Sequence, residues 1–467
     1  MRLSAVLATA CLLACLDATA SDLSPAQAAA FAFAPTVEQA SRPAVHIKAS
    51  RSWKTTTGSA PYEASVDEYP VTAEGQTVGL VSTFGYTETP VQASRPVVFL
   101  FNGGPGASSW SLHMEGFGPV RYDAAKDAFE DNPDALLDVA DLVFIDPLGT
   151  GESAPFTGTK PEAAWGAEGD ARATLSVMHQ WLVDHGRQNA TVFVVGESYG
   201  TARAAAMLHF ASAKEAASVR GVALLSLALG GLPDPAMQAA GRLPSMAATA
   251  WFHHKGSADL PSGMEAYQRA VSAQAPSSAD VKQWIGVASD DAKAAATRVP
   301  EAPAFRKALL ADSGKIVGSL DTRMTADHSL DALQPPYSDP GMTLGKRPST
   351  LMARYLVSLG YRSPVAYRML NLAINTSWNY GGSPDEWPFA GYVAEGMKAH
   401  PGLKLFTAGG IYDLSTPAYE GILTLRQVGV PANRWEAHIY PSGHTIGEDA
   451  TQRPVLASDL RRFITGN

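Results

Sequence analysis

The stretch from Val192 to Gly200 constrains the fold of this chain more than any other. Four β-forming residues, 192–195, run into the pentapeptide Gly-Glu-Ser-Tyr-Gly at 196–200, and an alanine-rich segment of good helix formers (201–208) follows directly. The serine, Ser198, therefore lies on a sharp turn from a strand to a helix. Such a turn strains the backbone at the serine, and side chains at either glycine would collide with the neighbouring strand or helix. The pattern predicts a nucleophilic serine.

Further apolar runs predict an α/β sheet around this turn. Residues 97–101 and 142–145 are continuous apolar runs, as expected of strands that are buried on both faces. Residues 171–183 carry their apolar side chains on one helical face. Strand, helix and strand in succession form a βαβ unit, so we expect a largely parallel sheet. An antiparallel hairpin, residues 62–71 and 77–86, is expected to precede it.

The composition changes between residues 234 and 400. Buried-strand runs are missing there, and the segment is rich in alanine, proline, serine and aspartate. We therefore expect residues 21–233 and 401–467 to form the two parts of an α/β core, with 234–400 inserted as a mainly helical cap over a pocket. Five aromatic residues of the cap either line this pocket or belong to plain core: Trp251, Phe252, Trp378, Tyr380 and Trp387.

The first twenty residues have the pattern of a secretory signal. One positive charge, a short apolar core and small residues before Ser21 predict cleavage after Ala20 and export to the periplasm or the medium. Both cysteines, Cys11 and Cys15, lie in this segment, so the mature chain has no disulfide framework. The alternative is a lipoprotein that is anchored through a lipid on Cys15, whose surroundings resemble a bacterial lipoprotein processing site.

Charge and hydropathy exclude several classes of partner. The net charge of −9 is spread along the chain and there is no basic face, so we expect no nucleic-acid partner. Beyond the signal segment no apolar run is long enough to cross a membrane. The adjacent pair His253-His254 has no carboxylate at ligand spacing, so we assign no metal and no cofactor.

A catalytic triad follows from the order of the strands. A serine hydroxyl needs an imidazole to remove its proton, and the imidazole needs a carboxylate to fix its tautomer. Asp413 follows the expected strand 403–407, and His444 follows the expected strand at 438–440. Serine, acid and histidine in that chain order are typical of an α/β-hydrolase. His438 is the rival base, but it lies inside a strand pattern, so we favour His444.

A glycine-rich loop completes a resemblance to a known family. The strand 97–101 ends in Asn-Gly-Gly-Pro-Gly at 102–106, a loop whose exposed N–H groups suit half of an oxyanion hole. With the pentapeptide at 196–200, Gly-Ile-Tyr-Asp at 410–413 and Gly-His at 443–444, the chain resembles the serine carboxypeptidases. These α/β-hydrolases remove C-terminal amino acids, so peptides are the implied substrates. The resemblance is clear over 97–208 and from 403 onward and weaker in the cap.

The resemblance also implies roles for further residues. It implies that the N–H groups of Gly104 and Tyr199 form the oxyanion hole, and that Asn102, Glu115 and Glu197 hold the free carboxylate of the substrate. Carboxyl groups bind a carboxylate only when they share protons, so we expect the pKa values of both glutamates to be high and the activity to peak in mild acid. The alternative for Glu115 is a charge on a helix surface.

Departures from the family leave other functions open. Ala107 stands where many relatives have cysteine, and Thr445 follows the expected catalytic histidine where relatives usually have methionine. A prolyl aminopeptidase shares the loop and the triad order but usually has histidine at the place of Asn102. An esterase or acyltransferase retains the triad without peptide cleavage. A secreted binding protein on a retired hydrolase scaffold is the alternative outside enzymes.

Overall fold

The computed structural model describes residues 32–466 apart from eight short gaps, at 56–57, 213–214, 216–217, 233, 257–277, 288–298, 334 and 336. The predicted signal segment 1–20, with its cleavage site and both cysteines, lies outside the described residues. None of the described helices is both long enough and apolar enough to span a membrane.

The strands are β1 (His46–Thr55), β2 (Gly58–Ala73), β3 (Gln76–Glu88), β4 (Val97–Phe101), β5 (Val120–Asp123), β6 (Ala128–Asp131), β7 (Asp141–Ile145), β8 (Ala154–Pro155), β9 (Val192–Glu197), β10 (Val219–Leu225), β11 (Lys315–Val317), β12 (Thr325–Asp327), β13 (Lys404–Gly410) and β14 (Trp435–Tyr440). The α-helices are α3 (Ala167–Asp184), α4 (Tyr199–Phe210), α6 (Pro235–Phe252), α8 (Ser278–Ile285), α10 (Ala302–Ala308), α11 (Thr350–Ser358), α12 (Leu372–Ser377), α13 (Phe389–Ala399), α14 (Ala418–Gln427) and α15 (Arg453–Thr465).

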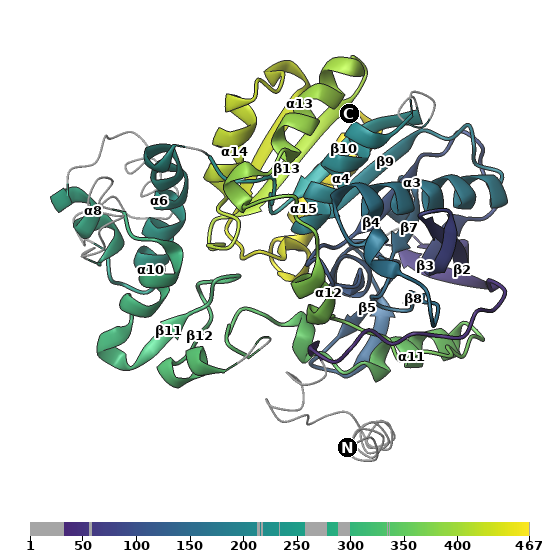
Figure 1. The fold of residues 1–467 in the computed structure, drawn as a ribbon, viewed down its shortest axis with the longest axis horizontal. Helices are drawn as coiled ribbons and strands as arrows, with labels where there is room; N and C mark the ends of the chain where they lie inside the picture. Colours follow the sequence, from purple (N-terminus) through teal and green to yellow (C-terminus); the bar gives the residue numbers. More distant parts are fainter. Residues whose placement is uncertain are drawn as a thin grey trace.

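One mixed sheet organises the molecule (Figure 1). In the part of the chain that the structure describes, its strand order is β1-β2-β3-β7-β4-β9-β10-β13-β14, with β8 paired to β3. The strands from β7 to β14 in this order pair in parallel, while β1, β2 and β3 extend the sheet in antiparallel fashion. The order reverses around β4, and ligands bind at the carboxyl ends of strands at such a switch point.

Helices cover both faces of this sheet because its central strands are apolar on both sides. Along β4, Phe99 joins a cluster with α3, α4, α13 and α14, whereas the neighbouring Val98 and Leu100 join a cluster with α11 and α15. Successive side chains of a strand point to opposite faces, so a continuous apolar run requires cover on each. This is the α/β-hydrolase arrangement, and the fold predicted from the sequence is confirmed.

The chain leaves the sheet after β10 to build a helical lobe. Helix α6 starts at Asp234, whose side chain accepts a hydrogen bond from the Ala236 N–H, and Pro235 occupies the first helical position. Apolar residues of α6, α8 and α10 form a core of their own, on the left of Figure 1. The hairpin β11–β12 closes this lobe.

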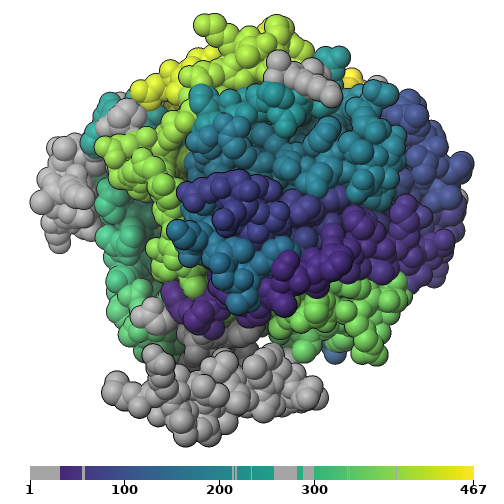
Figure 2. All heavy atoms as spheres, turned by 45° about the vertical axis from the view of Figure 1, so that its right-hand side comes forward, coloured from purple at the N-terminus to yellow at the C-terminus, as the bar shows by residue number. Residues whose placement is uncertain are grey.

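The segment expected to be cap, 234–400, returns to the sheet before its end. Helix α11 packs its apolar face into the cluster below the sheet, and Arg354 donates to Asp127 at 2.7 Å. In Figure 2 the green residues of this segment lie against the purple N-terminal strands. Helix α13 packs on α4, where Gly396 lies directly against Leu208. Only the part from α6 to β12 stands apart as a lobe in Figure 1.

Candidate active site

Ser198 occupies the turn between β9 and α4 with a strained backbone. Its φ of 59° and ψ of −129° lie outside the regions that side chains normally allow. A Cβ on Gly196 would lie 2.2 Å from the carbonyl oxygen of Gly200, and one on Gly200 would lie 2.8 Å from that of Phe101. The expected collisions at both glycines are therefore confirmed. The turn leaves the serine partly exposed while the residues on either side are buried.

Asp413 and His444 meet at the carboxyl ends of β13 and β14. The His444 Nδ1 lies 2.6 Å from Asp413 Oδ2, and both side chains are buried. Thr416 donates to the same carboxylate oxygen at 2.6 Å and lies 3.2 Å from the imidazole nitrogen. Burial disfavours the charged imidazole, but the Asp413 carboxylate, together with Glu197 and Glu448, outweighs it and raises the pKa of His444.

The strand order brings Ser198 toward this pair. Strands β9, β10, β13 and β14 are neighbours, so the loops that follow them share one edge of the sheet. The Ser198 N–H donates to the Leu225 carbonyl at 2.9 Å, and the next residue, Ser226, donates through its hydroxyl to the His444 carbonyl at 2.5 Å. Among the described residues no hydrogen bond joins the Ser198 hydroxyl to His444. This contact often tightens only when substrate binds.

The glycine loop after β4 packs against the residue that follows the serine. A Cβ on Gly103 would lie 2.3 Å from the Tyr199 nitrogen, so the loop backbone touches the first turn of α4. Gly104 has a φ of 96°, which glycine adopts without strain. The buried Arg203 fixes the loop from below, since it donates to the Asn102 carbonyl at 2.6 Å and to Asp170 at 2.6 Å. The loop and the first turn of α4 are thus held in contact beside Ser198.

Asn102 and Glu197 are directly paired beside the serine. The Asn102 Nδ2 donates to Glu197 Oε1 at 2.6 Å, and its Oδ1 accepts from the Leu112 N–H at 3.1 Å. Burial raises the pKa of Glu197 to about 8, against the lowering influence of His444, and Glu448 adds to the rise. Glu197 is therefore mostly protonated at neutral pH.

Glu115 is buried in a second acidic contact rather than on a helix surface. It lies in a π-helical turn, η2 (Ser111–Phe117), with 6% of its surface exposed. Burial and the Glu448 carboxylate raise its pKa to about 8, whereas Arg347, whose NH2 lies 2.7 Å from Glu115 Oε1, lowers it. The alternative of a surface charge for Glu115 is wrong, because the turn is buried against the loop 446–448.

Two residues at this site escaped the sequence analysis. Glu448 follows His444 by four residues in a short 3-10 turn, η10 (Ile446–Glu448), and its two oxygens accept hydrogen bonds from Ser111 at 2.7 Å and Thr343 at 2.9 Å. Arg347 lies between the lobe and α11, in a stretch of sequence without a recognisable motif. The short spacing from His444 was a usable signal for Glu448, whereas nothing in the sequence pointed to Arg347.

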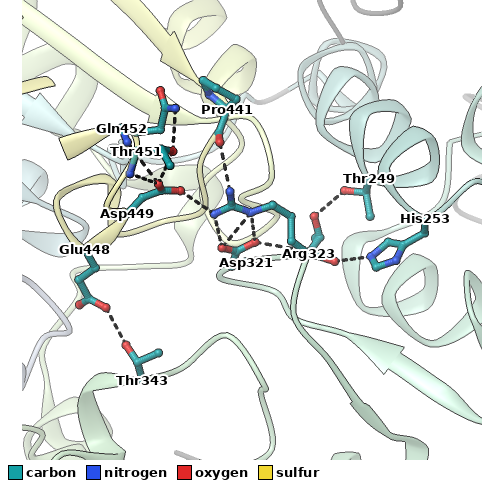
Figure 3. A network of polar contacts seen from close by, with 11 residues as sticks. Thr249, His253, Asp321, Arg323, Thr343, Pro441, Glu448, Asp449, Thr451 and Gln452 are labelled. Atoms are coloured by element: carbon teal, nitrogen blue, oxygen red, sulfur yellow. Dashed lines mark hydrogen bonds and ion pairs between the residues drawn. The ribbon is translucent and has the colours of Figure 1, made fainter. Parts of the chain in front are cut away.

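The lobe holds both triad loops through one strap, residues 318–324. The His444 N–H donates to the Leu320 carbonyl at 2.7 Å, and the Thr322 N–H donates to the Tyr412 carbonyl at 3.0 Å. Figure 3 shows Arg323 pointing from this strap toward the loop after β14. Its guanidinium pairs with Asp321 of the strap at 2.6 Å and with Asp449 of that loop at 3.0 Å. The loops that bear His444 and Asp413 are thus bonded to the same segment of the lobe.

Other residues singled out in the sequence lie around this site or away from it. Trp378 donates to the Tyr199 hydroxyl at 2.8 Å, and the rings of Tyr380 and Trp387 also pack on Tyr199. His438 is inside β14, stacked on Phe406. The remaining positions are at the end of α6, where Trp251 packs on the core of the lobe, Phe252 contacts Tyr412, and His253 bonds to the Thr322 carbonyl at 2.7 Å. Within the described ranges no histidines, cysteines and acids gather as a metal site.

Comparisons with known proteins agree with the family resemblance. The sequence model of the serine carboxypeptidases matches residues 84–306. These residues span the glycine loop and the strand-to-helix turn at Ser198, here called the elbow, and the match supports a hydrolase of the serine carboxypeptidase type. No curated protein sequence matches the chain.

Solved structures similar to the chain include lipases and esterases at low identity. An open-form lipase has a TM-score of 0.40 at 15% identity and covers 86% of this chain and 98% of its own. Esterase Est22 has a TM-score of 0.39 at 10% identity, with 86% and 81% covered. A peroxisomal α/β-hydrolase from Saccharomyces cerevisiae, Lpx1, has a TM-score of 0.35 at 11% identity, with 91% and 90% covered.

Proposed function

Since residues 84–306 match the serine carboxypeptidases, we propose that this hydrolase releases C-terminal amino acids from peptides through an acyl-enzyme on Ser198. The observation that carries the proposal is the buried Asn102–Glu197 pair, joined at 2.6 Å and adjacent in the chain to the nucleophile. A protonated carboxyl at this position is suited to donate a hydrogen bond to a carboxylate.

The proposed chemistry uses each polar group in turn. His444 accepts the proton of Ser198 as the hydroxyl attacks the last peptide carbonyl, and Asp413 holds the imidazole tautomer and stabilises its charge. The N–H groups of Gly104 and Tyr199 bind the oxyanion. His444 then protonates the leaving amine, which departs as the free amino acid. Water, activated by the same imidazole, hydrolyses the acyl-enzyme and regenerates the serine.

The free carboxylate of the substrate is bound on the leaving-group side in this proposal. Asn102 donates from its amide, and Glu115 and Glu197 donate while protonated. Because both glutamates have pKa values near 8, binding weakens above about pH 8. The raised pKa of His444 limits the activity on the acid side, since the imidazole must be neutral to accept a proton. The optimum then lies nearer neutrality than the mild acid expected from the sequence.

A peptide digest tests the proposal directly. A mixed peptide pool is incubated with wild type and with Ser198→Ala, and the products are followed by mass spectrometry over time. We expect ladders that shorten from the C-terminus in the wild type, and at least a thousandfold slower release in the variant. The same peptides with C-terminal amides should resist the enzyme. N-acetylated peptides, the matched control, should still be shortened.

Each alternative has its own outcome in this digest. Shortening from the N-terminus that acetylation blocks identifies a prolyl-aminopeptidase-like enzyme. Hydrolysis or transfer of esters without any peptide ladder identifies an esterase or acyltransferase. Failure of a fluorophosphonate to label Ser198 together with no turnover identifies a binding protein. Any of these results contradicts the carboxypeptidase proposal.

We also propose that the protein is exported, on the pattern of residues 1–20 alone. Mass spectrometry of the mature protein tests this. A chain that begins at Ser21 supports cleavage after Ala20, a diacylglyceryl group on Cys15 supports the lipoprotein alternative, and an intact Met1 contradicts both.

A further inference from the structure

The acidic contacts beside the serine contain a cation that the catalytic scheme does not use. Arg347 reaches Glu115 from the segment that follows the lobe, with its NH2 2.7 Å from Glu115 Oε1. Its side chain is 27% exposed, but its Nε is buried and has no hydrogen-bond partner among the described residues. A guanidinium carries five N–H donors in a planar fork that suits a carboxylate. The donor on Nε is therefore unused.

Glu115 also presents an unused atom in the same place. Its side chain is 7% exposed, and its Oε2 is buried with no hydrogen-bond partner in the described part of the chain. A buried polar atom without a partner costs free energy, so this oxygen is available to a group that binds here. Glu448, which also faces this position, is different because both of its oxygens already accept hydrogen bonds from Ser111 and Thr343.

The contacts link this position to the nucleophile. Leu112, in the same turn as Glu115, donates its N–H to Asn102, which in turn donates to Glu197 next to Ser198. The Glu448 carboxylate contributes to the raised pKa values of Glu115, Glu197 and His444, so its charge acts on both acidic contacts. Thr343, labelled with Glu448 in Figure 3, belongs to the same segment as Arg347. The segment 343–347 therefore reaches the carboxylate-binding side of the site.

A cation at this position favours the binding of a carboxylate. Three glutamates, Glu115, Glu197 and Glu448, face the position, and a substrate carboxylate adds a fourth acid. The nearby Arg453 already has partners within the protein. Its Nε pairs with Asp134 at 2.8 Å, and its NH1 donates to the carbonyls of Glu115 and Gly447. His444 is engaged by Asp413. Arg347 is the described cation that contacts these glutamates and still has a free donor.

We infer that Arg347 is a specificity-determining residue that binds the C-terminal carboxylate of the peptide together with Glu115. The inference rests on the proposed carboxypeptidase function and adds to it a fixed positive charge, which Asn102 and the two protonated glutamates do not supply. Binding of the carboxylate then depends on the docking of the segment 343–347 as well as on the core.

Paired substrates test the inference. One substrate is an N-blocked dipeptide with a free carboxylate, and the other is the ethyl ester of the same N-blocked first amino acid, whose leaving group has no carboxylate. In Arg347→Gln the ratio of kcat/KM for the acid to that for the ester falls tenfold or more, mostly through KM, as expected for the loss of a charged hydrogen bond. Arg347→Lys keeps the charge but not the planar pair of donors, so its ratio lies between those of the wild type and Arg347→Gln.

Controls separate contact from structural support. Arg354→Gln removes a surface arginine that pairs with Asp127, and it leaves the ratio unchanged. In a double-mutant cycle with Glu115→Gln, Arg347→Gln lowers the ratio in both backgrounds, because the arginine contacts the substrate itself. If Arg347→Gln lowers the ratio only in the background that retains Glu115, Arg347 acts by positioning Glu115, and the inference is overturned. Equal loss on both substrates, or no loss, overturns it too.

The same assay separates this inference from the function on which it rests. A wild-type enzyme that hydrolyses the ester but not the peptide acid refutes the carboxypeptidase proposal, and the inference fails with it. A wild-type enzyme that cleaves the peptide while the ratio in Arg347→Gln stays unchanged refutes the inference alone. Thermal melting of each variant identifies any loss of folding. If Arg347→Gln does not fold, the ratio is compared between Arg347→Lys and the wild type instead.

Discussion

Glu197→Gln isolates the proton that the carboxylate site requires. The pKa of Glu197 is about 8 in place of 4.5, so ionising this buried carboxyl costs about 5 kcal/mol more than in water. With that pKa, about nine-tenths of the side chain is protonated at pH 7 and about one-tenth at pH 9. Glutamine keeps the shape and stays neutral at every pH. Its oxygen still accepts from Asn102 and its NH2 still donates to a carboxylate.

The expected difference is in the alkaline limb of the pH profile. In the wild type, Glu115 and Glu197 both lose protons near pH 8, so log kcat/KM for an N-blocked dipeptide falls above that pH with a slope that approaches about −2. In Glu197→Gln one of these protons is gone, and we expect a slope of about −1. At pH 6 the variant remains within about tenfold of the wild type, because one neutral donor replaces another.

Steady-state kinetics from pH 5.5 to about pH 10 provides the measurement. The ester substrate, which has no terminal carboxylate, is the internal control and lacks the alkaline limb that the glutamates produce. Glu168→Gln, on the exposed face of α3, is the matched variant and leaves the profile unchanged. An alkaline limb of unchanged slope and midpoint in Glu197→Gln refutes the reasoning, because the titrating group is then not Glu197.

Two further substitutions test the surroundings of the triad and of the sheet. Thr416→Val removes the hydroxyl that donates to Asp413 at 2.6 Å, so we expect kcat to fall about tenfold with KM little changed and Thr416→Ser to restore it; equal activity in all three proteins contradicts the role. Glu152 is buried with a pKa of about 8, so its contribution to stability is present below its unfolded pKa and is lost as pH rises through 8. Melting curves are therefore recorded at pH 6 and at pH 9. We expect Tm to fall less between these pH values in Glu152→Gln than in the wild type or in the exposed control Glu162→Gln. An equal fall in all three proteins contradicts the prediction.

The parts of the site that the sequence predicted follow strand ends. Ser198, Asp413 and His444 each come directly after a buried apolar run, and parallel strands deliver such residues to one edge. The Asp413–His444 contact at 2.6 Å is the geometry that this reasoning requires. The elbow was predictable for a second reason, since its two glycines have close backbone neighbours that exclude any side chain.

The residues that escaped prediction depend on contacts between distant segments. Arg347 meets Glu115 across more than two hundred residues, and no local pattern specifies where the segment 343–347 docks. Strand β1 was not predicted, although it pairs with β2 along its full length. The end of the cap was placed at residue 400 because 234–400 lacks buried strands, yet Phe389 and the rest of α13 serve the sheet.

The strap 318–324 joins the lobe to the loops that bear Asp413 and His444. Its carbonyl at Leu320 holds the N–H of the catalytic base, and its Thr322 N–H is bonded to the loop that bears Asp413. Asp321 lies directly against Gly443, because a Cβ added to Gly443 would lie 2.6 Å from the Cβ of Asp321. The strap and the His444 loop are therefore closely packed. Asp413 and His444 follow β13 and β14 in the same sheet that carries Ser198 after β9, so the strap is a second support for residues that the sheet already positions.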